Sequence, residues 1–255
     1  MPKIDNTASP DPFKLPVIVL CGPQVPGNVG AVARAMANFG LSDLRLVNPC
    51  DHLADEARMF AAGAVQLLEA ARIFPDLAAA ISDLQITIAT TRREGRLRGR
   101  LLDITQLPAL LGSLPADAKA GLVFGRERSG LTSEEVALCS HTARVATSDS
   151  TGSLNLAQAV VLFLYELARQ PERTASETEG ELPTQQELGN MFAQMATVLE
   201  RIAFLNPSCR EAGLNKLRRL IARANPDRNE VALLRGLWSQ LSWSINDWRG
   251  RKRGG

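Results

Sequence analysis

Several residue types and patterns are scarce in this 255-residue sequence, and each absence narrows what the protein can be. Its cysteines, at positions 21, 50, 139 and 209, form no Cys-x-x-Cys pair. We therefore expect four reduced thiols in a cytoplasmic protein, with neither a zinc site nor a disulfide framework. No apolar run reaches the roughly 18–20 residues that a membrane span needs, so no membrane segment is predicted. Residues 1–14 lack the apolar centre of a secretory signal and are typical of a short disordered leader.

Common catalytic and nucleotide-binding patterns are also missing. His52 and His141 are the only histidines, and neither pairs with an obvious nucleophile or carboxylate set. The sequence thus gives no support for a Ser or Cys hydrolase or for a metal site, and we expect His141 to be structural. There is no G-x-x-x-x-G-K-[ST] loop. Residues 22–30 are glycine-rich but do not follow G-x-G-x-x-G, so a nicotinamide dinucleotide fold is only weakly indicated.

What is present is typical of a globular protein with a basic C-terminal part. Hydrophobic residues make up 45% and charged residues 22% of the chain, and the net charge is +2. Residues 183–255 hold twelve Lys and Arg against six Asp and Glu, whereas residues 1–182 hold 17 against 21. The C-terminal segment is basic enough to suggest contact with phosphates, although a solvated charged face would have the same composition.

The N-terminal two thirds of the chain alternates between apolar runs and helical patterns. Alternation of this kind predicts an α/β domain with a mostly parallel sheet. The predicted strands span residues 15–21, 44–47, 84–89, 119–124 and 144–147, and the main predicted helices span residues 27–39, 55–71, 77–81 and 155–168.

A segment with few apolar residues then separates this domain from a helical extension. We expect a leader over residues 1–14, one domain over 15–169, a linker over 170–182 and a helical extension over 183–255. In the extension, apolar residues from Leu188 to Leu205 recur at spacings of 3 and 4, which is a seam that another helix must cover. Further helices are predicted over residues 213–224 and 228–248. They pack either on their own subunit or across a dimer.

Three polar turns follow predicted strands, at residues 26–34, 125–130 and 152–155. Ligands of open α/β sheets bind beyond the carboxyl ends of the strands, where glycines allow close approach. Taken singly, each turn has an ordinary explanation. Asn28 and Ser153 are typical helix caps, Asn155 is a typical first-turn residue and Arg34 is typical of a surface.

Taken together, the three turns resemble the motifs of the SPOUT methyltransferases, in particular the branch that methylates the ribose 2′-hydroxyl of RNA. The first motif, N-x-G-A-x-x-R-x-x-x-x-F-G, is matched by Asn28, Gly30, Ala31, Arg34, Phe39 and Gly40. The second, L-V-F-G-x-E-x-x-G-L-T, is matched by residues 122–132, and the third, S-L-N-L-x-x-A, by residues 153–159. The segments at residues 204–206, 216–220 and 234–243 resemble the C-terminal extension of tRNA (cytidine/uridine-2′-O-)-methyltransferases that act at position 32 of the anticodon loop.

The resemblance implies a SPOUT trefoil-knotted, mostly parallel sheet domain with a C-terminal helical extension. It also implies S-adenosylmethionine bound in a bent form in the knot, a homodimer that completes the site, and tRNA as the substrate. The implied catalytic residues are Asn28, Arg34, Glu127, Ser153 and Asn155. The implied cofactor contacts are Thr90, Thr91, Arg92, Gly125, Val145, Gly152, Ser153 and Leu154. At Gly152 relatives often have serine, so only a backbone contact would be retained there.

The resemblance assigns Arg34 as the general base. Deprotonating a guanidinium of pKa about 12.5–13.8 at pH 7 costs about 8 kcal/mol, at ~1.4 kcal/mol per unit. A positioned cation that stabilises developing alkoxide charge costs less, and such help is commonly worth a few kcal/mol. Arg34 is predicted to be essential, with either role open.

RNA binding has its own pattern in the sequence. Residues 92–100 pack five arginines and two glycines into nine positions, which suits a clamp on phosphates, although a solvated loop is the alternative. The predicted RNA contacts in this loop are Arg92, Arg93, Arg96, Arg98 and Arg100. Those in the tail are Lys216, Arg218 and Arg219, with Arg223 a further candidate.

Two other functions fit the same residues less closely. One is a SPOUT 2′-O-methyltransferase for ribosomal RNA or another tRNA position, which the helical tail disfavours. The other is a non-catalytic RNA-binding protein on the same fold, which the presence of Arg34, Glu127, Ser153 and Asn155 disfavours.

Overall fold

The computed structural model describes residues 15–91, 101–115, 117–148, 154–169, 181–205, 208 and 210–247. The chain divides into two compact units, with the boundary between residues 178 and 179. The predicted leader over residues 1–14 and most of the predicted linker lie outside the described residues. Each unit is described by itself below.

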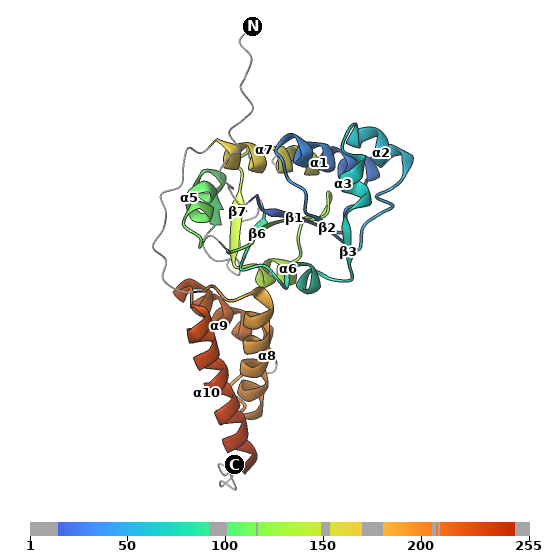
Figure 1. Ribbon diagram of the computed structural model, residues 1–255. Helices are drawn as coiled ribbons and strands as arrows, with labels where there is room; N and C mark the ends of the chain where they lie inside the picture. The colour runs from blue at the N-terminus through green and yellow to red at the C-terminus, as the bar shows by residue number, and fades with distance from the viewer. Residues whose placement is uncertain are drawn as a thin grey trace. The chain divides into compact units, whose positions relative to one another are not determined.

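The first unit is built on a seven-stranded sheet in which every pair of neighbouring strands is parallel (Figure 1). This architecture confirms the predicted α/β fold. The strands are β1 (Val17–Cys21), β2 (Leu44–Val47), β3 (Arg72–Phe74), β4 (Ile86–Thr90), β5 (Leu101–Asp103), β6 (Ala120–Phe124) and β7 (His141–Arg144). Their order across the sheet is β3-β2-β1-β6-β4-β7-β5.

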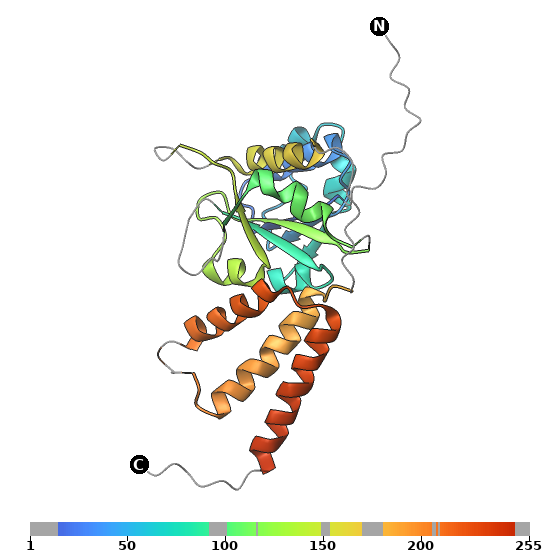
Figure 2. The ribbon, with the colours of Figure 1, turned by 90° about the vertical axis from the view of Figure 1, so that its left-hand side faces the viewer.

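Helices cover both faces of this sheet (Figures 1 and 2). They are α1 (Pro26–Asn38), α2 (Asp55–Ala61), α3 (Val65–Glu69), α4 (Leu77–Ile81), the 3-10 turn η1 (Ile104–Gln106), α5 (Leu107–Gly112), α6 (Ser133–Leu138) and α7 (Leu156–Ala168). Helices α1 and α7 pack against each other on one face. Helices α4 and α6 cover the other face, where they share a core with one side of β1.

The central strands are buried on both sides, which explains their continuous apolar runs. All five residues of β1 and all five of β6 are buried, and the two strands pair from Val17 with Gly121 to Leu20 with Phe124. Strands of this kind need no polar face, because helices cover both sides of a parallel sheet. The same register brings the carboxyl ends of β1 and β6 together, and both strands end in polar turns.

Two glycines let α2 lie directly against α1. A Cβ atom on Gly30 would sit 2.1 Å from the backbone oxygen of Ala57, and a Cβ atom on Gly27 would sit 2.7 Å from a carboxylate oxygen of Glu56. Any larger residue at position 30 would push the helices apart, since a backbone atom cannot move aside as a flexible side chain can. The glycines of the first motif therefore fix where α2 lies relative to the start of α1.

The structure corrects three details of the sequence prediction. The helix expected over residues 55–71 is two helices, because the chain turns at Gly63, whose φ of +86° favours glycine. The short edge strand β3 and the segment from β5 to α5 were not predicted. The last predicted strand, expected at residues 144–147, begins three residues earlier, at His141.

The second unit contains three helices, α8 (Gln185–Arg201), α9 (Arg210–Ala224) and α10 (Arg228–Asp247). The seam of α8 is buried at Met191, Met195 and Val198, as its spacing predicts. The helix stops at Arg201 and Ile202 is half exposed, whereas Leu205, the last residue of the predicted seam, still packs against the core of this unit. At the other end, Arg228 of α10 donates to Glu181 at 2.7 Å and to Glu187 at 2.8 Å, which ties the start of α10 to the start of α8.

None of the described helices is both long and apolar enough to cross a membrane.

Candidate functional site

The loop after β6 folds back on itself as a small hairpin. Arg126 and Gly130 exchange backbone hydrogen bonds of 3.3 and 2.8 Å, and Gly130 has a φ of +69°. A Cβ atom on Gly125 would lie 2.2 Å from the backbone of Gly130 and Leu131, so only glycine fits at the base of the hairpin. The hairpin holds Glu127 beyond the carboxyl end of the sheet.

A chain of hydrogen bonds joins the three polar turns. Glu127 accepts from the Asn28 side-chain amide at 2.9 Å and from the backbone N–H groups of Gln24 at 2.9 Å and Val25 at 3.2 Å. The Asn28 amide oxygen in turn accepts from the Asn155 side chain at 2.8 Å. Residues 127 and 155 lie far from residue 28 in the sequence, yet the three side chains meet. We call Glu127, Asn28 and Asn155 the polar chain.

The sequence suggested Asn28 as a helix cap and Asn155 as a first-turn residue, and the structure reverses these roles. Asn155, expected in the first turn, is the N-cap of α7 and accepts from the backbone N–H groups of Ala157 and Gln158 at 2.9 and 3.3 Å. The N-cap of α1 is Val25, which has no capping side chain. Asn28 therefore does not cap α1, and its side chain serves the polar chain instead.

Hydrogen bonding keeps Glu127 ionised. Burial by itself would raise the pKa of Glu127, but the hydrogen bonds from Asn28 and from the backbone of Gln24 and Val25 outweigh it and hold that pKa below its usual value. A carboxylate with a lowered pKa is a weak base, and its lone pairs are already engaged. Glu127 is thus built to hold Asn28 and the β1–α1 turn rather than to take up a proton.

A second interaction, the Arg126–Glu135 pair, anchors the hairpin from the other side. The Arg126 guanidinium donates to both carboxylate oxygens of Glu135 at 3.0 to 3.1 Å. Glu135 also accepts from the backbone N–H of Thr132 at 2.7 Å and completes a capping box at the start of α6. The arginine stem lies over Gly22, where a Cβ atom would be 2.9 Å from the Arg126 Nε. One arginine thus links the hairpin to α6 and to the end of β1.

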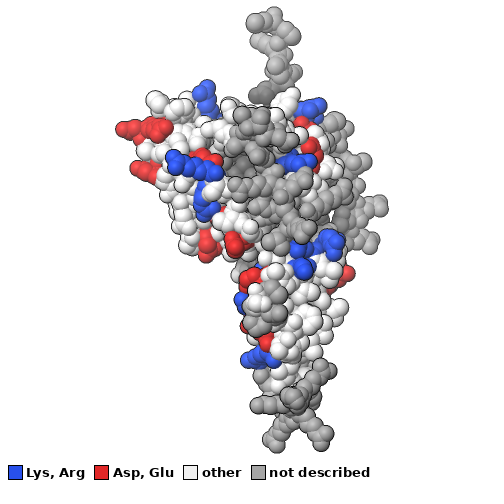
Figure 3. All heavy atoms as spheres, turned by 180° about the vertical axis from the view of Figure 1, so that it is seen from behind, with Lys and Arg blue, Asp and Glu red and all other residues white. Residues whose placement is uncertain are grey.

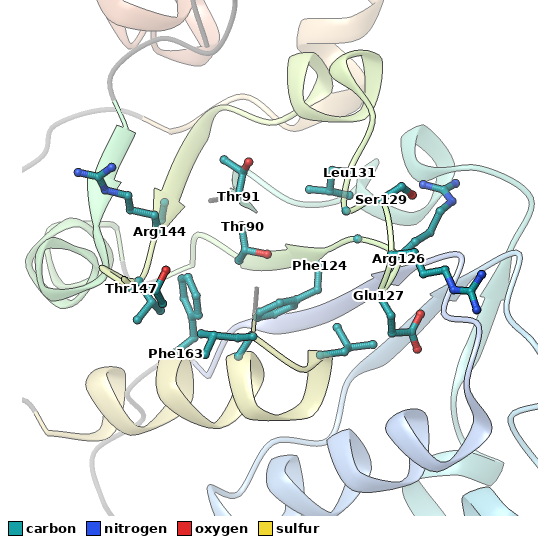
Figure 4. Close-up of a pocket in the computed structure, with 18 residues that line it drawn as sticks. Thr90, Thr91, Phe124, Arg126, Glu127, Ser129, Leu131, Arg144, Thr147 and Phe163 are labelled. Carbon is teal, nitrogen blue, oxygen red and sulfur yellow. The ribbon is translucent and has the colours of Figure 1, made fainter. Parts of the chain in front are cut away.

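A pocket of about 290 Å³ lies over the ends of β6, β4 and β7 (Figure 4). The rings of Phe124 and Phe163 meet edge to face there, with centroids 5.5 Å apart. Glu127 lies at the end nearest to α1, and Arg144 and Thr147 lie at the opposite end. The lining residues are Thr90, Thr91, Phe124–Leu131, Ala143–Val145, Thr147, Leu154, Leu156, Ala159 and Phe163.

All five described residues that the sequence proposes for cofactor binding line this pocket, namely Thr90, Thr91, Gly125, Val145 and Leu154. The others, Arg92, Gly152 and Ser153, lie outside the described residues. Arg34 is exposed on α1 and does not line the pocket of its own chain. The sequence did not single out Arg126, Phe163 or Glu135. The T-x-x-E pattern at residues 132–135 is a capping-box signal that points to Glu135, but nothing in the sequence pairs it with Arg126.

The predicted RNA-binding residues are only partly described. Arg92, Arg93, Arg96, Arg98 and Arg100 lie outside the described residues. In α9, Lys216 is exposed, whereas Arg218 lies over the Phe192 ring and donates to Asn215. Arg219 donates to the Asn215 backbone oxygen at 3.1 Å. In the described part of the face seen in Figure 3, basic and acidic side chains are interspersed.

In the part of the chain that the structure describes, cysteines and metal-ligating side chains form no further centre. Cys21, Cys50 and Cys139 are free thiols, and Cys209 lies outside the described residues. Burial raises the pKa of Cys139 to about 12, so this thiol is inert at neutral pH. Among the described residues, no three His, Cys, Asp or Glu side chains are placed to hold a metal ion together.

The chain belongs to the SpoU rRNA methylase family, whose model matches residues 16–165, the part that carries the polar chain and the pocket. The match confirms the family that the three motifs predict. A second family model, the C-terminal domain of the tRNA methyltransferase TrmJ, matches residues 186–251.

Individual relatives are similar over nearly the whole chain. The TrmJ protein of Pseudomonas aeruginosa strain UCBPP-PA14, a tRNA (cytidine/uridine/adenosine-2′-O-)-methyltransferase, is 36% identical over 236 residues, which cover 88% of this chain and 92% of the relative. The tRNA (cytidine/uridine-2′-O-)-methyltransferase TrmJ of Cronobacter sakazakii is 35% identical, with 90% and 97% covered. The crystal structure of TrmJ from Z. mobilis ZM4 is 33% identical, with a TM-score of 0.80, and covers 89% of this chain and 99% of that chain.

Proposed function

We propose that this protein transfers a methyl group from S-adenosylmethionine to the ribose 2′-hydroxyl of cytidine or uridine at position 32 of the tRNA anticodon loop. The observation that carries the proposal is the polar chain, which joins the three motif turns at the edge of the pocket. The whole-length similarity to TrmJ methyltransferases supports tRNA as the substrate. The trefoil knot remains an expectation, because residues 149–153 lie outside the described part of the chain.

The pocket suits S-adenosylmethionine in size and lining. Its volume of about 290 Å³ is close to the lower end of the ~300–1,000 Å³ of small-molecule sites. Phe124 and Phe163 offer an apolar surface, and Gly125 lets the hairpin close tightly so that its backbone forms one wall of the pocket. Thr90, Thr91, Gly125, Val145 and Leu154 would hold the cofactor, together with Arg92, Gly152 and Ser153. When bound, the cofactor supplies an electrophilic methyl group on a sulfonium.

The residues of the polar chain act by positioning. Glu127 uses its carboxylate to hold the Asn28 amide and the turn before α1. Both ends of the Asn28 amide are then engaged, so Asn28 orients its neighbours and does not accept a proton. The Asn155 amide oxygen accepts from the first turn of α7, and one hydrogen of its amide nitrogen is donated to Asn28. The second hydrogen can then be donated to a substrate oxygen. Ser153 is proposed to contact the ribose.

Arg34 is proposed to act in the site of a partner subunit. It is exposed on α1 and lies away from the pocket of its own chain, so a homodimer in which α1 faces the other subunit would bring it to the acceptor ribose. There a guanidinium can stabilise developing negative charge on the 2′-oxygen. If Arg34 acts across the dimer, mixing Arg34→Ala subunits with Gly125→Ala subunits restores activity that neither variant has alone.

The basic segments would bind the phosphates of the RNA. Arg92, Arg93, Arg96, Arg98 and Arg100, with Lys216, Arg218 and Arg219 of the tail, are the proposed contacts. Unpaired anticodon-loop bases are splayed, and RNA is usually read at such sites. We place the protein in the cytoplasm with its tRNA substrate. Neutralising Arg96, Arg98 and Arg100 should weaken tRNA binding and flatten its salt dependence. An unchanged slope would remove this loop from the contact surface.

The test is to map ribose methylation after incubating the purified protein with S-adenosylmethionine and either unmodified tRNA or ribosomal RNA. We expect one new 2′-O-methyl group in the tRNA, at position 32. Methylation of ribosomal RNA, or of another tRNA position, would overturn the substrate assignment. Binding of RNA and cofactor without methyl transfer would overturn the enzymatic one.

A further inference from the structure

A small surface beside the polar chain has no assigned role. The sheet order places the pocket over β6, β4 and β7, and the polar chain at the junction of β6 and β1. Beyond the polar chain, on the β1 and β2 side, lie Val25, Glu56 and Phe60, which we call the shelf. Val25 is 40% and Phe60 is 47% exposed, so both present apolar surface directly beside a polar site.

The shelf touches the site directly. The Val25 N–H donates to Glu127 at 3.2 Å. Gly27, the residue before Asn28, has no side chain, and Glu56 and Phe60 fill that space. A Cβ atom on Gly27 would be 2.7 Å from a Glu56 oxygen and 3.1 Å from the Phe60 ring. The aromatic ring and the carboxylate therefore lie against the backbone that carries Asn28.

The loop that carries Cys50 lies close enough to the shelf for charges on both sides of it to act on the thiol. Burial raises the pKa of the Cys50 thiol, and the negative charges of Glu127, Asp51 and Glu56 raise it further. The loop that carries Cys50 is also tied to the turn after β1, because the Cys50 N–H donates to the Pro23 oxygen at 2.9 Å.

We propose that the shelf binds the base of the nucleotide to be methylated, with the base stacked on Phe60 and a base N–H donating to Glu56. The inference rests on the proposed function. A methyl donor in the pocket leaves the acceptor ribose at the polar chain, and the base of that nucleotide then extends to the opposite side, where the shelf lies. Both pyrimidines can use Glu56, because cytidine offers its N4 amine and uridine its N3–H. An aromatic face accepts either base.

The shelf also differs from an ordinary contact between subunits in its chemistry. A subunit contact that buried the shelf would have to pair the Glu56 carboxylate with a donor from the partner, because burying an unpaired carboxylate is costly. A planar ring next to an exposed carboxylate is instead the combination that holds a splayed base, by stacking and by a hydrogen bond to its edge.

The test compares substitutions that keep or remove the ring. Phe60→Tyr keeps an aromatic face, Phe60→Leu keeps apolar volume only, and Met59→Ala changes an exposed neighbour on the same helix. We expect Phe60→Leu to lower kcat/KM for tRNA by about 5- to 150-fold, the range that loss of one stacked base produces. Phe60→Tyr and Met59→Ala should stay within about threefold of the wild type. The S-adenosylmethionine Kd and the oligomeric state should not change.

A modified substrate separates stacking from other effects. A tRNA with 5,6-dihydrouridine at the acceptor position carries a non-planar base that stacks poorly, so wild type and Phe60→Leu should methylate it at nearly equal rates. If Phe60→Leu lowers the methylation rate by the same factor on uridine and on dihydrouridine substrates, the proposal is overturned. A Phe60→Leu variant with the wild-type rate, a changed cofactor Kd or a dissociated dimer would also overturn it, the last identifying the shelf as a subunit interface.

Failure of the proposed function itself would be visible in the wild type, which would then methylate no tRNA. The shelf remains testable in that case by fluorescence anisotropy with an anticodon stem-loop RNA. Weaker binding by Phe60→Leu than by Phe60→Tyr would support it, and equal binding would overturn it.

Discussion

Replacing Arg126 by alanine removes the side chain that anchors the hairpin after β6, and we expect the pocket to lose affinity for its cofactor as a result. Arg126 makes a two-pronged ion pair with Glu135, and the side chains are 30% and 15% exposed. The hairpin supplies one wall of the pocket and carries Glu127. Without the anchor, the hairpin keeps its two backbone hydrogen bonds between Arg126 and Gly130 and the contacts of Glu127 with the turn before α1, but loses its tie to α6.

The size of the effect follows from the exposure of the pair. Hydrogen bonds to charged groups contribute about 1.5–3 kcal/mol, and fully exposed pairs about 0–1 kcal/mol. A partly exposed, two-pronged pair should lie between these limits, at about 1–2 kcal/mol. For a unit of this size that corresponds to a fall in Tm of about 2–8 °C. If the same energy keeps the hairpin closed for binding, the S-adenosylmethionine Kd rises by at most about 5- to 30-fold.

The assay is calorimetric titration with S-adenosylmethionine, alongside thermal unfolding, for Arg126→Ala, Glu135→Ala and the double variant. Because the two residues act as one pair, their effects on Kd should not add, and the double variant should resemble the worse single variant. Arg169→Ala is the matched control, since Arg169 pairs with Glu166 on the surface of α7 and is 60% exposed. Additive losses, or an Arg126→Ala variant that binds the cofactor as the wild type does, would refute the reasoning.

Three further predictions concern the site and the fold. Asn28→Ala and Asn155→Ala should each lower kcat by about 10- to 100-fold, because the reacting groups are then misplaced. The effects should not add in the double variant, and strictly additive effects on the single-turnover rate would contradict the polar chain. Arg34→Ala should lower kcat by about 100-fold or more with an unchanged cofactor Kd. If the positive charge is what matters, Arg34→Lys should retain more activity than Arg34→Gln. A wild-type rate for Arg34→Ala would exclude Arg34 from the reaction. Burial lowers the pKa of His141, so below about pH 6.5 the unfolded state takes up the proton first and the free energy of unfolding should fall by up to about 1.4 kcal/mol per pH unit. Chemical denaturation of His141→Leu should lack this slope, and an identical slope in both proteins would be evidence against the assignment.

The sheet could be predicted from the sequence where strands are central and not where they lie at an edge. The runs that became β1 and β6 are continuously apolar because both faces of these strands are buried. The edge strand β3 has three residues, two of them exposed, so its sequence carries no burial pattern. The single helix predicted over residues 55–71 was wrong, because the chain turns at Gly63. The apolar spacing continues on both sides of this turn, so the sequence pattern alone does not show it.

The candidate site shows the same division between local and long-range information. The motif residues Asn28, Glu127 and Asn155 stand out in the sequence, but their mutual hydrogen bonds depend on the register of β1 against β6. The Arg126–Glu135 pair is closer in sequence, yet it requires the hairpin at Gly125, which brings the arginine back towards α6. Contacts of this kind are set by tertiary packing and leave no periodic pattern.

The most direct test of the account is a crystal structure of the protein with S-adenosylhomocysteine, the product of methyl transfer from the cofactor. We predict that it lies in the pocket between Phe124, Phe163 and the hairpin, with the hydrogen bonds from Asn155 to Asn28 and from Asn28 to Glu127 intact beside it. A ligand bound elsewhere, or a polar chain broken by its binding, would contradict the claim that the three turns form one methyl-transfer site.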